Sequence, residues 1–314
     1  MTGYKHAHPA SSKEDATALV QTLSGVSCVL ITPFYDGFVG VDKTLLSNLA
    51  ASIANQGIHS LTALGNTAEV HQLDWSEREA VLGSVAAAGE TATLIAGVSG
   101  PFPSLIREAE LATELGYKAI MVHEPTDPFG DAQGLLNYYF ALCDASPLPV
   151  VLYLRTSLLD VSNLARLIDH PAVVGVKYAR SDLESMAALR GVVGSTGCVW
   201  INGAAETRVA DFLDLSVTGF TSGLANAIPA ASLAIHQAAV EGDQERLGHL
   251  IDLVRPLEDL RTKNRNRNNV AVIKELLRLN GLPVGQVRPP HMQLDTATAL
   301  AVRELREAVL AEIP

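Results

Sequence analysis

Eight short apolar runs divide the first 222 residues of this chain at regular intervals. They cover residues 26–32, 60–64, 93–98, 119–123, 150–154, 173–178, 198–201 and 217–221. Between them, apolar residues recur at helical spacing, as in Leu45, Leu46, Leu49 and Ile53 after the first run. This alternation predicts an α/β protein built from repeated strand-helix units.

A strand, a helix and a second strand imply parallel pairing through a right-handed crossover. Eight such units predict a closed (β/α)8 TIM barrel. An open doubly wound sheet is the alternative, but no glycine-rich phosphate loop follows any of the runs, since Gly97 and Gly100 are too sparse to form one.

The chain divides into three predicted parts. We expect residues 1–21 to form a mobile N-terminal leader, residues 22–226 the catalytic barrel, and residues 227–314 a helical C-terminal domain. Beyond residue 227 the patterns are helical, over residues 233–240, 244–260, 270–279 and 297–310. Residues 261–269 concentrate four basic side chains and are predicted to form a solvated loop, with an anion site or subunit contact as the alternative.

Composition limits the partners and the compartment. Hydrophobic residues make up 48% of the 314 and charged residues 18%, which suffices for a large core. The formal net charge of −11 disfavours nucleic acid and anionic membranes as partners. Three cysteines without metal-ligand spacing indicate free thiols in a reducing compartment, and no uninterrupted apolar run of about 18 residues occurs. We therefore expect a cytoplasmic protein.

Lys177 ends the sixth apolar run, where a strand would deliver its amine into the barrel. Barrel enzymes carry their chemistry at the carboxyl ends of the strands, and the same ends here hold Tyr153 and the loop with Asn66 and Thr67. A buried amine has a lowered pKa and can attack a carbonyl carbon near neutral pH. The combination predicts imine chemistry on a small carbonyl substrate, with no cofactor and no metal.

Five segments carry a resemblance to known proteins. They are Thr32 to Phe34, Gly65 to Glu69, Leu148 to Tyr153, Gly175 to Lys177, and Gly219 to Ser222 with Asn226. In this order and at this spacing they resemble motifs of the dihydrodipicolinate synthase and N-acetylneuraminate lyase superfamily of pyruvate-dependent class I aldolases. The resemblance runs from about residue 26 to the end of the chain. It implies a barrel with a helical C-terminal domain, assembled as a homo-oligomer, either a dimer or a tetramer.

The resemblance also implies roles for individual residues. Lys177 would form the imine with the keto carbon of pyruvate or another 2-oxo acid, and Tyr153 would shuttle protons to and from the intermediate. The backbone and side chains around Asn66 and Thr67 would hold the substrate carboxylate. Asn66 stands where many members have a threonine, so the proton relay of this chain is altered.

Other departures bear on the substrate. Thr126 and Asp127 replace the paired tyrosines that usually follow the fourth strand, and Leu158 stands where the lysine-pathway synthases have a carboxylate-binding arginine, with Arg155 out of register. Glu206 matches a position that binds sugar hydroxyls in sialic acid lyases. The four residues expected to contact the substrate beyond the imine are Glu206, Thr221, Ser222 and Arg155.

We therefore predict a Schiff-base lyase acting on a 2-keto-3-deoxy sugar acid, by retro-aldol cleavage or by dehydration. The alternative within the family is 4-hydroxy-tetrahydrodipicolinate synthase, which condenses pyruvate with aspartate semialdehyde. Two other classes remain open. One is metal-assisted chemistry at His123, Glu124 and Asp127, although adjacent strand residues point to opposite faces. The other is a non-catalytic barrel that binds a 2-oxo acid.

Overall fold

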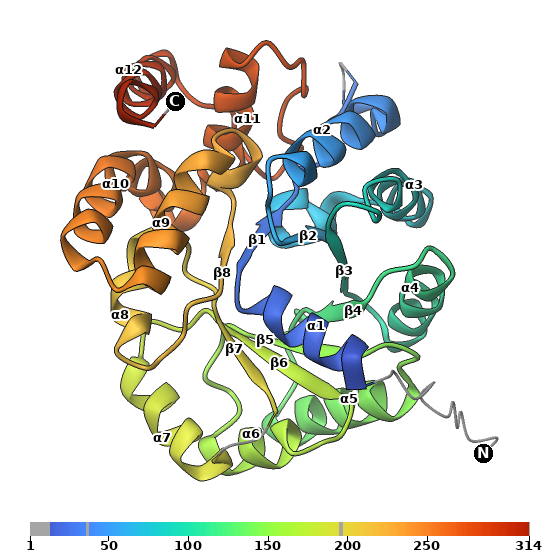
Figure 1. Cartoon of the computed structure of the whole chain (residues 1–314). Coiled ribbons are helices and arrows are strands. Elements are labelled where there is room, and N and C mark those ends of the chain that lie inside the picture. The colour runs from blue at the N-terminus through green and yellow to red at the C-terminus, as the bar shows by residue number, and fades with distance from the viewer. Residues whose placement is uncertain (1–12, 36–37, 195–196, 314) are drawn as a thin grey trace.

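The computed structural model describes residues 13–35, 38–194 and 197–313, and within them eight parallel strands close into a barrel (Figure 1). Each strand pairs with the next along the chain, and the last strand pairs with the first. The strands are β1 (Val26–Val29), β2 (Ser60–Ala63), β3 (Thr93–Val98), β4 (Ala119–Val122), β5 (Val150–Leu154), β6 (Val173–Tyr178), β7 (Val199–Asn202) and β8 (Phe220–Ser222). The predicted (β/α)8 barrel is confirmed, and the open sheet is wrong because β1 and β8 are paired.

Helices follow the strands and surround the barrel (Figure 1). They are α2 (Lys43–Asn55), α3 (Trp75–Ala86), α4 (Phe102–Glu114), α5 (Ala132–Ala145), α6 (Val161–Ile168), α7 (Leu183–Val193), α8 (Val209–Leu213) and α9 (Pro229–Glu241). Aspartates begin several of them: the carboxylates of Asp42, Asp131, Asp160 and Asp182 each accept a backbone N–H three residues on. In the described residues, no helix is long and apolar enough to cross a membrane.

The strands are buried on both faces, which explains why they appear as continuous apolar runs. Val151 and Met121 belong to a core inside the barrel, whereas their neighbours Leu152 and Ile120 pack outward in the larger core beneath the helices. This alternation decides which strand residues face the interior, where a substrate would bind.

Part of the predicted leader is ordered and packs against the barrel. Residues 13–21 belong to helix α1 (Lys13–Leu23), and its Leu19 and Leu23 are buried in the inner core with Val151 and Ile201. Residues 1–12 lie outside the described part of the chain. For residues 13–21, the expectation of a mobile leader is wrong, because the apolar face of α1 covers one end of the barrel interior.

The C-terminal region is helical, with α10 (Gln244–Asn266), α11 (Asn269–Leu279) and α12 (Thr296–Glu312) following α9. Helix α9 contacts β1 and α8, and its His236 Nε2 lies 3.1 Å from the Ser24 carbonyl oxygen. It therefore supplies the eighth helix around the barrel. We propose that the boundary of the C-terminal domain lies after α9 rather than at residue 226.

The prediction of a solvated loop over residues 261–269 is wrong for its first part. Helix α10 continues to Asn266, and Arg261 is buried in an ion pair with Glu258 at 2.5 Å. A run of basic and amide side chains is typical of a solvated loop. Here the charge of Arg261 is neutralised by Glu258, one turn earlier, so Arg261 can be buried within the helix.

Candidate active site

Lys177 and Tyr153 occupy neighbouring positions on β6 and β5 and face each other inside the barrel. Their Cα atoms are register partners, and the Lys177 Nζ lies 4.0 Å from the centroid of the Tyr153 ring. Lys177 is 6% exposed, and Tyr153 belongs to the inner core. The structure therefore brings together the two residues predicted to carry the chemistry.

The environment of Lys177 favours its neutral amine. Burial lowers the pKa of Lys177, and the positive charge of Arg155 lowers it further, while Tyr153 opposes both effects. Only the unprotonated amine has the lone pair that attacks a carbonyl carbon. A lowered pKa thus raises the reactive fraction near neutral pH.

The loop after β2 reaches the same place. Its 3₁₀ turn η2 (Asn66–Ala68) presents Asn66, whose Nδ2 donates to the Tyr153 hydroxyl at 3.3 Å. Thr67 follows in the same turn and is buried. The Thr32 hydroxyl donates to the Ala68 carbonyl oxygen at 2.8 Å, which ties this turn to the chain after β1. The predicted carboxylate-binding loop therefore lies beside the tyrosine.

Arg155 stands just beyond β5 with its Cζ 5.9 Å from the Tyr153 ring centroid. It is exposed, and its backbone N–H donates to Glu124, whose other carboxylate oxygen accepts from Thr156. Glu124 thereby fixes the turn that carries the guanidinium. Thr221 is buried on β8, in register with Ser27 of β1, on the face opposite to that of its neighbour Ser222.

The metal hypothesis treats His123 as a ligand, and its contacts are different. Its ring lies edge-on to that of Tyr153, with centroids 5.6 Å apart, and its Nε2 is 3.0 Å from the Leu64 carbonyl oxygen. Burial is the main cause that lowers the pKa of His123 to about 3, so the imidazole is neutral. Since a carbonyl can only accept, Nε2 carries the proton.

The three residues of the metal hypothesis point to separate partners. His123 faces Tyr153, Glu124 accepts from the backbone after β5, and the Asp127 carboxylate accepts from the Phe129 N–H at 2.7 Å. Within the described residues, no group of three or more His, Cys, Asp or Glu side chains is arranged to hold a metal ion.

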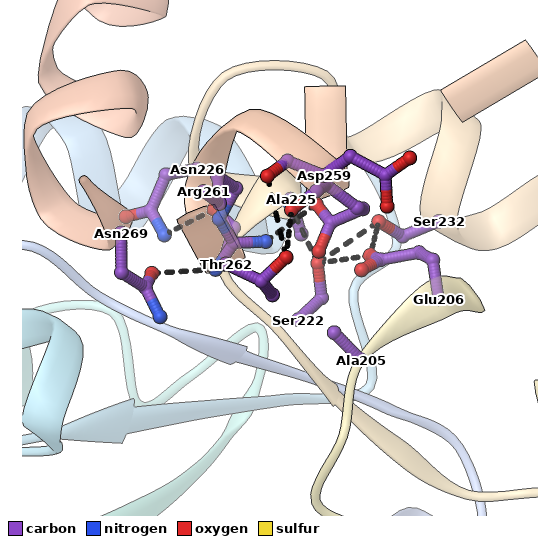
Figure 2. A network of polar contacts seen from close by, with 12 residues as sticks. Ala205, Glu206, Ser222, Ala225, Asn226, Ser232, Asp259, Arg261, Thr262 and Asn269 are labelled. Atoms are coloured by element: carbon purple, nitrogen blue, oxygen red, sulfur yellow. Dashed lines mark hydrogen bonds and ion pairs between the residues drawn. The ribbon is translucent and has the colours of Figure 1, made fainter. Parts of the chain in front are cut away.

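Glu206 and Ser222 are not part of the group around Lys177. Both side chains are fully buried: the Glu206 carboxylate accepts from the hydroxyls of Ser222 and Ser232, beneath α9 and α10 (Figure 2). Glu258 and Arg261 lie in the same network and interact with Glu206 electrostatically. The predicted contact of Glu206 and Ser222 with substrate has no support in this geometry.

The burial of Glu206 gives a prediction for stability. Burial, and next the negative charge of Glu258, raise the pKa of Glu206 from 4.5 to about 7. The folded protein therefore holds a proton that the unfolded chain has released, so this group makes the protein less stable as the pH rises from about 5 to 8, by about 3 kcal/mol. Glu206→Gln, which imitates the protonated acid, is expected to remove this part of the decline in urea titrations.

The exposed Glu241→Gln, on α9, is the matched control and should leave the pH profile of stability unchanged. An equal decline with pH in wild type and Glu206→Gln would show that Glu206 titrates normally.

Tyr178, the residue after Lys177, faces away from the site, since its hydroxyl donates to the Asp182 carbonyl oxygen at 2.6 Å. Glu69 is fully buried and pairs with Lys274 at 2.8 Å. The two partners are 205 positions apart in the chain, so no local pattern in the sequence predicts their ion pair.

Comparison with known proteins agrees with this fold. A probable 5-dehydro-4-deoxyglucarate dehydratase of Streptomyces griseus is 30% identical over 262 residues, 81% of each chain. A 4-hydroxy-tetrahydrodipicolinate synthase of Acidothermus cellulolyticus is 30% identical over 91% of each chain. The crystal structure of dihydrodipicolinate synthase from Oceanobacillus iheyensis superposes with a TM-score of 0.90 at 29% identity, covering 95% of this chain and 100% of that one.

The sequence model of the dihydrodipicolinate synthetase family matches residues 22–309, which include every strand of the barrel and extend into the last helix, α12. Lys177, Tyr153 and the loop after β2 lie together within the matched region. This chain belongs to the dihydrodipicolinate synthetase family.

Proposed function

We propose that this protein is a Schiff-base-forming lyase that acts on a 2-oxo acid. The observation that carries the proposal is the buried amine of Lys177, 4.0 Å from the Tyr153 ring centroid on the adjacent strand. Members of its family are lyases and dehydratases of this kind. The amine attacks the keto carbon of the substrate, and loss of water leaves an iminium in which the carbon is bonded to Nζ.

The neighbouring groups are assigned to the remaining steps. The positive iminium acidifies the protons on the adjacent carbon, so one leaves and an enamine forms. The Tyr153 hydroxyl moves protons to and from the substrate, and Asn66 orients it through their hydrogen bond. The backbone and hydroxyl at Thr67 hold the carboxylate.

For the substrate we propose a 2-keto-3-deoxy sugar acid. Several relatives carry the name of a probable 5-dehydro-4-deoxyglucarate dehydratase, which supports this class. The exposed guanidinium of Arg155, close to Tyr153, offers a cation for the far end of a polar or anionic substrate. Thr221 adds a hydroxyl on β8. Dehydration and retro-aldol cleavage both start from the imine at Lys177.

The test is a set of 2-keto-3-deoxy sugar acids, with and without a second carboxylate, assayed for loss of the parent acid, for pyruvate and for dehydrated product. We expect turnover of at least one of them, with either pyruvate or the dehydrated 2-oxo acid as product. Turnover of none, together with trapping of pyruvate, would overturn the sugar-acid assignment and leave the lyase class intact.

A second candidate is 4-hydroxy-tetrahydrodipicolinate synthase, favoured by relatives of that name at up to 30% identity. Leu158 is exposed where these synthases have the arginine, so Arg155 would have to bind the second carboxylate. Condensation of pyruvate with aspartate semialdehyde, at a rate above that for every sugar acid, would favour the synthase function. Binding of pyruvate without borohydride trapping at Lys177, and without turnover of any substrate, would favour the non-catalytic barrel.

We also propose a homo-oligomer and a cytoplasmic location. Phe129 and Leu158, 94% and 47% exposed in the loops after β4 and β5, are large apolar side chains that contact with another copy of the chain would cover. The three cysteines are free, which supports a reducing compartment.

A further inference from the structure

The turn at residues 64–69, hereafter the 64–69 turn, begins and ends in strained backbone. Leu64 has a φ of 53° and Glu69 a φ of 58°, both in the left-handed region that favours glycine. Neither residue is glycine, so each conformation is costly on its own. Such strain persists where surrounding contacts hold it, and it is found preferentially at functional sites.

The first contact holds the start of the turn. The Nε2–H of His123 donates to the Leu64 carbonyl oxygen at 3.0 Å. Gly97 of β3 also lies against this carbonyl, because an added Cβ would come within 2.3 Å of the same oxygen. The carbonyl of the strained residue therefore contacts both β3 and the side chain that follows β4.

The second contact holds the end of the turn. The carboxylate of Glu69 is fully buried, 2.8 Å from the Nζ of Lys274 on α11, and accepts from the backbone N–H of Arg288 at 2.7 Å. Lys274 also donates to the Gln286 carbonyl oxygen, and the Arg288 guanidinium forms two hydrogen bonds with Glu77. The C-terminal region therefore contacts the end of the turn through the ion pair of Lys274 with Glu69 and the hydrogen bond from the Arg288 backbone.

Between these two contacts lie the groups assigned to substrate. Asn66 bonds to the Tyr153 hydroxyl, and Thr67 follows it. A shift at either end of so short a turn moves Asn66 and Thr67 directly, because few bonds separate them from Leu64 and Glu69.

We propose that His123 and Glu69 are positioning residues that hold the 64–69 turn in the shape that binds the substrate carboxylate. The inference rests on the proposed function and adds two residues that do not touch the reacting atoms. It explains why a neutral imidazole and a buried carboxylate lie beside a site whose chemistry uses neither.

The test is the pyruvate concentration that gives half-maximal borohydride trapping, measured with His123→Phe and Glu69→Gln. Phenylalanine keeps the ring against Tyr153 and removes the N–H, and glutamine keeps the shape of Glu69 and removes its charge. For each variant we expect half-saturation to rise about tenfold or more, the factor that corresponds to about 1.4 kcal/mol, with the trapping rate at saturating pyruvate within about threefold of wild type. Glu69→Asp, which keeps the charge, should recover part of the affinity.

Two matched variants separate positioning from general loss of stability. His236→Phe removes the imidazole bond to the Ser24 carbonyl, and Glu258→Gln removes the buried ion pair with Arg261; neither pair involves the 64–69 turn. Both should keep the wild-type half-saturation. If Glu69→Gln does not fold, the half-saturating pyruvate concentration of His123→Phe tests the proposal.

Unchanged half-saturation in the folded variants, with wild type trapped normally, would overturn this inference alone. An equal rise in His236→Phe and Glu258→Gln would also overturn it. Absence of trapping in wild type would instead overturn the proposed function.

Discussion

Lys177→Ala is expected to abolish both turnover and borohydride trapping while the protein stays folded. The amine supplies the covalent step, and Tyr153, Asn66 and His123 around it offer no second primary amine. Lys177→Arg should fail equally, because a guanidinium stays protonated and cannot form an imine. The measurements are the rate of substrate loss and the incorporation of pyruvate after reduction.

The control is Lys118→Ala, which removes an exposed lysine immediately before β4. It should be trapped and turn over like wild type. A Lys177→Ala protein that keeps a substantial share of wild-type activity would remove Lys177 from the mechanism.

Tyr153→Phe is expected to lower the catalytic rate by about 10² to 10⁴, the usual effect of losing a positioned proton-transfer group. The phenyl ring keeps the packing against Lys177 and His123, so only the hydroxyl and its bond from Asn66 are lost. Pyruvate should still be trapped, more slowly. Steady-state rates with the best sugar acid, together with trapping rates, measure both effects.

Tyr178→Phe is the matched control, since the Tyr178 hydroxyl bonds to the Asp182 backbone outside the site. Its rate should stay within about threefold of wild type. A Tyr153→Phe enzyme with a rate this close to wild type would mean that the protons pass through another group.

The fold could be predicted because each strand is buried on both faces and so leaves a continuous apolar run. The strand ends differ from the prediction: β1 ends at Val29 rather than residue 32, and β8 begins at Phe220 rather than residue 217. Helix α1 was missed because its burial depends on packing against the barrel interior, which its own sequence does not reveal.

The direction of side chains within strands could be predicted, because the alternation of a strand fixes the direction of each side chain. The direction of side chains in the turns after the strands could not be predicted in this way. Lys177 and Tyr153 lie within strands, so their side chains follow the period of two. Glu206 comes after Ala205, whose φ of 63° turns the chain before the 3₁₀ turn η4 (Glu206–Arg208), and the carboxylate is carried beneath α9. The spacing of Glu206 from Gly203 in the sequence could not show that its carboxylate lies beneath α9. The contacts of His123 and Glu69 join distant segments and leave no local pattern.

Reduction of the wild-type protein with borohydride in the presence of pyruvate, followed by peptide mass mapping, shows whether Lys177 forms the imine. We expect one irreversible pyruvate-derived mass gain, on the peptide that contains Lys177, and none on that peptide without pyruvate. A peptide that stays unmodified at Lys177, or a modification at another lysine with Lys177 unchanged, would contradict this expectation.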